Sequence, residues 1–130
     1  MNLPISFDRK FRPWRYLISH SVLKLRSIDY DSAPDFIEVT FIDVLGVKLK
    51  AEYHPLIIGI APSAEVDEIL KFSGVQESPH RDKVRCLILA ADTGDGFVAC
   101  TNYVIRSHPR GKEYDSTGAP HPDSTLILRG

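Results

Sequence analysis

The residues that could carry acid–base or metal chemistry are spread along this sequence rather than grouped. The five histidines are His20, His54, His80, His108 and His121. None has the short spacing to a second histidine, as in HxH or HExxH, that metal sites use. The sequence also has no GxSxG elbow, no phosphate-binding loop and no dinucleotide fingerprint. The motifs therefore predict no catalytic residue, no metal site and no cofactor.

His20 is the histidine that comes nearest to a catalytic pattern, because Ser19 and Ser21 flank it. Neighbours along a strand point to opposite faces, so adjacency does not make a nucleophile–base pair. An active site can still be assembled from residues far apart in the chain. The candidates for such a small enzyme or ligand-binding site are His20, His54 and Tyr103.

A stronger signal is the segment 7–16, FDRKFRPWRY, which interleaves four basic with four aromatic side chains. A second basic cluster runs from Arg106 to Lys112. Arg, Trp and Tyr are common anchors at protein interfaces, and bases interleaved with aromatics can also grip single-stranded nucleic acid. A third interpretation is a packed tail whose bases are solvated.

The net charge of −1 gives the chain no general attraction for nucleic acid or for anionic membranes. We therefore interpret the two clusters as a surface for a protein partner, with nucleic acid as the alternative. The residues expected to contact the partner are Trp14, Arg15, Arg106, His108 and Arg110.

Length and composition predict one globular domain over residues 1–130, with 43% hydrophobic and 25% charged residues. Cys86 and Cys100 lie in apolar runs and are expected to be buried. The N-terminus has no apolar signal core, and no apolar run is long enough to span a membrane. A cytoplasmic protein is the expectation.

Hydrophobic periodicity predicts an α+β fold: a bent antiparallel sheet, or two packed sheets, with one short helix over residues 63–73. Residues 36–61 are predicted to form three strands, of which the first two alternate and the third, 56–60, is apolar on both faces; we expect antiparallel meander pairing for them. Residues 14–27 are predicted to form one long strand with a β-bulge near Ser19–Ser21. Ser63 should cap the helix, and Gly74 should end it.

The remaining segments are predicted from their turn residues. The run 92–96, DTGDG, is typical of a hairpin. Residues 1–13 are expected to be an irregular lead-in, and residues 107–123 a long loop of functional interest. Residues 124–129 form a last strand, which could pair within the domain or across a homodimer.

The runs SHSVLKLRS at 19–27 and FIEVTFIDVLGVKL at 36–49 resemble a pattern in small uncharacterised bacterial proteins. The chain is also similar there to immunity proteins of bacterial toxin systems. That resemblance implies a small, β-rich, cytoplasmic and non-enzymatic protein that neutralises a partner. It assigns no catalytic residue.

Overall fold

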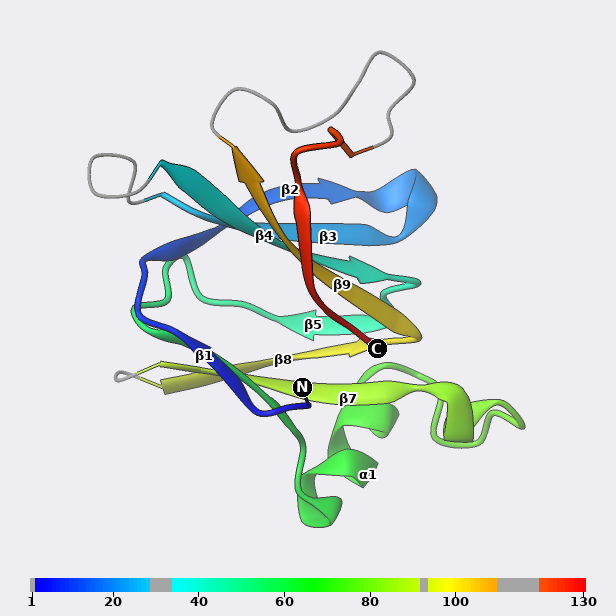
Figure 1. Ribbon diagram of the computed structural model, residues 1–130. Helices are drawn as coiled ribbons and strands as arrows, with labels where there is room; N and C mark the ends of the chain where they lie inside the picture. Colours follow the sequence, from blue (N-terminus) through cyan, green and yellow to red (C-terminus); the bar gives the residue numbers. More distant parts are fainter. Residues whose placement is uncertain (1, 29–33, 92–93, 110–119) are drawn as a thin grey trace.

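The computed structural model describes residues 2–28, 34–91, 94–109 and 120–130 (Figure 1). Two five-stranded antiparallel sheets form its body. Sheet A has the order β1-β6-β7-β8-β5. Its strands are β1 (Ile5–Phe7), β6 (Leu56–Ile60), β7 (Arg85–Ala91), β8 (Gly94–Cys100) and β5 (Gly46–Lys48).

Sheet B has the order β10-β9-β4-β3-β2. Its strands are β10 (Thr125–Arg129), β9 (Asn102–Pro109), β4 (Asp35–Ile42), β3 (Val22–Ser27) and β2 (Phe11–Leu17). Two short 3-10 helices, η1 (Ile18–His20) and η2 (Arg81–Lys83), connect strands. The expectation of a β-rich fold with antiparallel sheets and one helix is confirmed.

The main hydrophobic core lies between the two sheets. Sheet B supplies the inward side chains of alternate positions, such as Leu25, Val39 and Ile105, which are fully buried. Sheet A supplies Ile58 and Val98 from the facing side. Alternation along each strand therefore sends one set of side chains into this core and the other set to an outer face.

The outer face of sheet A is covered by α1 (Ser63–Phe72) (Figure 1). Ile69 and Leu70 of the helix form a second apolar cluster with Cys86 and Ala99 of the sheet. Cys100 belongs instead to the core between the sheets. The two free cysteines thus lie on opposite faces of the β7–β8 hairpin.

The helix begins at Ser63 and ends before Gly74, as the sequence predicts, but its N-terminal cap differs from the prediction. Gly74 follows it with φ of 75°, a conformation that glycine adopts without steric cost. The N-cap is Pro62, and no side chain caps the first turn, so the predicted role of Ser63 is wrong. The hairpin prediction is confirmed by the β7–β8 pairing, although residues 92–93 of its turn are outside the described residues.

The meander predicted for residues 36–61 is wrong. β4 pairs with β3 and β9 in sheet B, whereas β5 pairs with β8 and β6 pairs with β1 and β7 in sheet A. Asp43, with φ of 55°, lies at the point where the chain leaves one sheet for the other. Alternation identifies strands but does not say which strands pair.

Three further segments differ from the sequence prediction. The stretch 14–27 is two strands joined by η1, and a chain reversal with Ser21 at φ of 51° replaces the predicted bulge. The lead-in 1–13 contains β1 and the beginning of β2, and β9 extends into the predicted loop as far as Pro109. For β1 and β9, backbone pairing with a strand distant in the chain supplies the order that the local sequence does not indicate.

No helix in the described part of the chain is long and apolar enough to cross a membrane.

Candidate functional site

The outer face of sheet B carries an unusual concentration of positive charge. Its strands point their second set of side chains away from the core, and no helix packs on this face in the described structure. We call this surface the basic face. It comprises Arg12, Trp14, Arg15, Lys24, Arg26, Phe36, Glu38, Thr40, Val104, Arg106, His108, Leu126 and Arg129.

The strand register arranges the basic face in two adjacent rows. One row runs across the five strands as Arg12, Arg26, Glu38, Arg106 and Leu126. The other row runs as Arg15, Lys24, Thr40, Val104 and Arg129. At about 4.8 Å between strands, each row is about 19 Å long. Six cations therefore surround one carboxylate within a compact patch.

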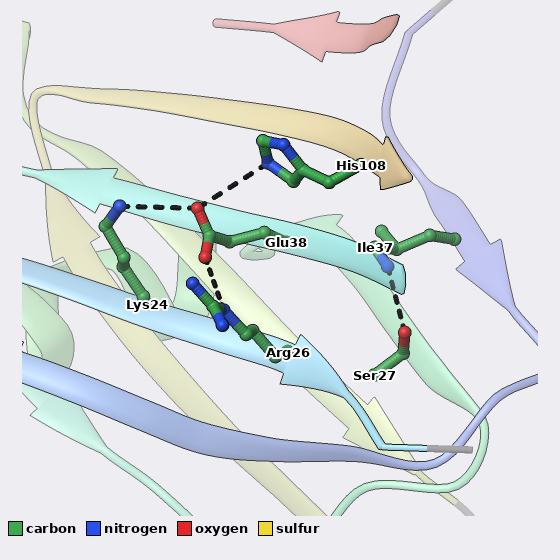
Figure 2. A network of polar contacts seen from close by, with 6 residues as sticks. All are labelled: Lys24, Arg26, Ser27, Ile37, Glu38 and His108. Carbon is green, nitrogen blue, oxygen red and sulfur yellow. Dashed lines mark hydrogen bonds and ion pairs between the residues drawn. The ribbon is translucent and has the colours of Figure 1, made fainter. Parts of the chain in front are cut away.

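Glu38 is the centre of a polar network that Figure 2 shows from close by. Its carboxylate accepts a hydrogen bond from Arg26 Nε at 2.6 Å and another from Lys24 Nζ at 3.3 Å. His108 Nε2 lies 3.8 Å from Glu38 Oε1. Glu38 is only 2% exposed, so these contacts compensate for the loss of hydration of its charge.

Arg26 also links the network to a stack of rings. Its guanidinium lies 4.8 Å from the ring centroid of Trp14 and 4.8 Å from that of Phe36. Phe36 in turn stacks on the imidazole of His108, with centroids 5.1 Å apart. Contacts between a cation and aromatic faces are favourable, especially where water is excluded. The side chain of Arg26 is thus fixed from both sides.

His108 is fully buried within this network. Burial lowers the pKa of His108, and the charges of Arg26, Arg106 and Lys24 lower it further, while Glu38 opposes them. The imidazole is therefore neutral at neutral pH. Its contribution to the face is packing and polarity rather than positive charge.

A second polar contact fixes the beginning of β4. Asp35 accepts a hydrogen bond from Arg9 at 3.1 Å and another from the Ser107 hydroxyl. Burial disfavours the charged form of Asp35, but these two donors and the charge of Arg9 outweigh it, so its pKa lies below the ordinary value. The contact between Asp35 and Ser107 thus joins β4 to β9 next to Phe36 and His108.

A pocket of about 200 Å³ opens on the basic face above Glu38. Lys24, Arg106 and Arg129 line it, with Thr40 and Pro120. Within the described residues, Arg15, Arg106 and Arg129 form no ion pair with any carboxylate. Their charges are available to a bound anion.

The structure brings together four of the five predicted partner-contact residues. Trp14, Arg15, Arg106 and His108 all belong to the basic face, although His108 is buried in it. Arg110 lies outside the described residues.

The three residues of the alternative site are dispersed. His20 ends η1, just beyond the end of β2, whereas His54 follows Tyr53, whose backbone pairs with Phe11 at the start of β2. These points are about 20 Å apart along the strand. Tyr103 is on β9, separated from β2 by two strands. No hydrogen bond joins any two of the three in the described structure, and His54 instead lies 3.6 Å from Asp8.

Sequence reasoning missed the centre of the face: Lys24, Arg26, Glu38 and Arg129. Lys24 and Arg26 share one parity at the end of a strand, and Glu38 interrupts an otherwise apolar run. These are signals of a charged sheet face, but their convergence depends on the register between strands that are distant in the chain.

Among the described residues, no three His, Cys, Asp or Glu side chains gather as they would around a metal ion. No protein family model matches the chain, and comparison with curated proteins and with solved structures gives no match.

Proposed function

We propose that this protein is a non-catalytic, cytoplasmic binding module whose basic face docks onto an acidic surface of a protein partner. The observation that carries the proposal is the gathering of six cations around one buried carboxylate, in a chain whose net charge is −1. Unlike charges across an interface guide the encounter and fix the orientation of the two proteins.

The arrangement of side chains supports a protein partner in particular. Trp14 is 49% exposed and lies in the bulge of β2, between Arg12 and Arg15. Trp and Arg are the residues that most often contribute binding energy at protein interfaces. The overall charge gives no long-range attraction for a polyanion, on which non-specific nucleic-acid binding depends.

The immunity type is the specific form of the proposal. The two runs that resemble immunity proteins include β3 and β4, which supply Lys24, Arg26 and Glu38. A module of this type acts by covering a surface of its partner, and it needs no catalytic group of its own.

The test is direct binding to the products of neighbouring genes, co-expressed with this chain and measured with purified proteins by calorimetry. We expect Arg15→Glu and Arg106→Glu each to weaken binding by about tenfold or more, because each replaces attraction by repulsion. Lys71→Glu is the matched control, since Lys71 is an exposed residue of α1 beyond sheet A.

Two outcomes would overturn the proposal. One is the absence of any stable partner, or a partner whose affinity does not change with either arginine reversal. The other is tight binding of single-stranded DNA or RNA that falls steeply with salt and is lost in the same variants, which would identify the face as a nucleic-acid surface.

A further inference from the structure

A second feature, remote from the basic face, is a cleft of about 820 Å³ at one end of the two sheets. It lies where β7 begins and where β6 and β8 end, and residues 101–103 at the β8–β9 corner form one wall. Pockets for small molecules have volumes of this order and occur at the mouths of β-barrels and similar folds.

Thr101 holds one negative and one positive side chain in this cleft. Its hydroxyl donates to Asp43 Oδ2 at 2.8 Å, and its carbonyl accepts a hydrogen bond from Arg85 Nε at 3.2 Å. The terminal amino groups of Arg85 make no hydrogen bond or ion pair with the described residues. A guanidinium oriented through Nε can offer these two groups to a carboxylate.

Tyr103 adds a polar group that has no partner in the described structure. The residue is 6% exposed and lines the cleft, with its ring packed closely against Gly130. Its hydroxyl forms no hydrogen bond with any described residue, and it is not one of the fully buried polar atoms that lack a partner, so it can be reached from the cleft. Burial raises the pKa of Tyr103, although Arg85 opposes the shift, so the hydroxyl remains a donor.

The charges of the cleft balance. Asp43 and Asp82 are matched by Lys83 and Arg85. The other wall is apolar and includes Ile60, which is 71% exposed. A ligand with a single charge would pair with the cations or with the carboxylates of the cleft, but not with both. A ligand that carries both charges and an aliphatic group would complement the cations, the carboxylates and the apolar wall.

We propose that this cleft binds a small zwitterion of the class of aliphatic α-amino acids. Arg85 and the Tyr103 hydroxyl bind its carboxylate, Asp43 binds its ammonium group, and its side chain covers the apolar wall at Ile60. The inference is independent of the proposed protein partner, because it concerns a different end of the molecule.

The test uses leucine, isoleucine and valine as probes, with amide chemical shifts of the 15N-labelled protein as the readout. We expect saturable shifts at Asp43, Arg85 and Asn102. Two analogues of leucine serve as controls: 4-methylpentanoate lacks the ammonium group, and 3-methylbutylamine lacks the carboxylate. Each should bind about tenfold more weakly or worse, because each leaves a charged group of the cleft unpaired.

Substitutions in the cleft test whether leucine binds through the side chains that we propose. Arg85→Gln and Asp43→Asn should each weaken leucine binding by about tenfold, and asparagine tolerates the positive φ of position 43. Tyr103→Phe removes only the hydroxyl and should weaken binding less. Arg15→Gln, on the basic face, is the matched control and should leave leucine binding unchanged.

The inference is overturned if none of the three amino acids gives a saturable shift up to about 10 mM, a concentration that corresponds to very weak affinity. It is also overturned if both analogues bind as well as leucine, or if Arg85→Gln and Asp43→Asn bind it unchanged. Failure here would leave the partner proposal intact, because the residues of the basic face are not among those that line the cleft.

Discussion

Glu38 shows how a single residue can organise a charged surface. Its carboxylate is almost fully buried, yet it contacts Arg26 and Lys24 and lies close to His108. Without it, two cations and an imidazole would share a poorly hydrated space with no negative charge at its centre. Removing one member of a buried ion pair is costly for this reason.

We therefore expect Glu38→Ala to lower the free energy of unfolding by about 3–5 kcal/mol. Glu52→Ala is the matched control, because Glu52 also pairs with an arginine, Arg12, but at 3.5 Å and at the surface. That substitution should cost about 0–1 kcal/mol. Urea denaturation followed by the fluorescence of Trp14 measures both, and equal effects would show that the Glu38 network does not stabilise the fold.

At the scale of elements, the basic face depends on the pairing of strands that are far apart in the chain. The sequence predicts most of the strands correctly, because residues 36–42 alternate with a period of two and residues 84–90 form a short apolar run. It does not predict that β4 and β5 belong to different sheets, since this depends on pairing with β9 and β8. The neighbours of Glu38 across the sheet could not be known without that register.

Gly96 illustrates how closely two elements of sheet A approach. A Cβ atom added there would lie 2.2 Å from the carbonyl oxygen of Lys48 and 2.7 Å from the Tyr53 hydroxyl. That hydroxyl accepts a hydrogen bond from the Lys50 amide at 2.9 Å. The absence of a side chain at this position allows β8, β5 and the segment after β5 to pack together.

We expect Gly96→Ala to destabilise the protein by about 1–3 kcal/mol, because a methyl group would displace backbone atoms. Gly59→Ala on β6 is the control: its Cβ would lie 3.8 Å from Pro4, an ordinary contact. It should be neutral or stabilise by up to about 1 kcal/mol through the unfolded state. Thermal unfolding measures the stability of the two variants. A similar loss of stability in both would contradict the steric explanation.

At the scale of the whole molecule, the two sheets have different outer faces. The helix α1 packs on the outer face of sheet A (Figure 1), whereas the outer face of sheet B carries the basic face. Composition predicted a neutral globular domain, and the clusters around Trp14 and Arg106 were recognisable in the sequence. That they meet on one side, with Lys24 and Arg26 between them, follows only from the strand order.

The stability of the whole molecule should depend on pH through His108. Burial and the neighbouring cations lower its pKa in the folded state, below the ordinary value of 6.5. As the pH falls below that value, the unfolded chain takes up a proton that the folded chain resists, so unfolding becomes easier. We expect the urea midpoint to fall between about pH 7.5 and pH 5, and to fall less in His108→Gln.

His54→Gln is the control for this prediction, because His54 is at the surface and 48% exposed. Its pH profile should follow that of the unmodified protein. Asp35 does not interfere, since its lowered pKa affects stability only below its ordinary value of 3.8. An unchanged slope in His108→Gln would show that other groups cause the loss at acid pH.

The placement of the two cysteines has a consequence for where the protein can work. Cys86 faces the helix and Cys100 faces the core, so no disulfide can join them without rebuilding the β7–β8 hairpin. Burial also raises the pKa of Cys100 to about 12, which leaves little reactive thiolate. The fold therefore depends on no internal disulfide, and its stability does not require oxidising surroundings.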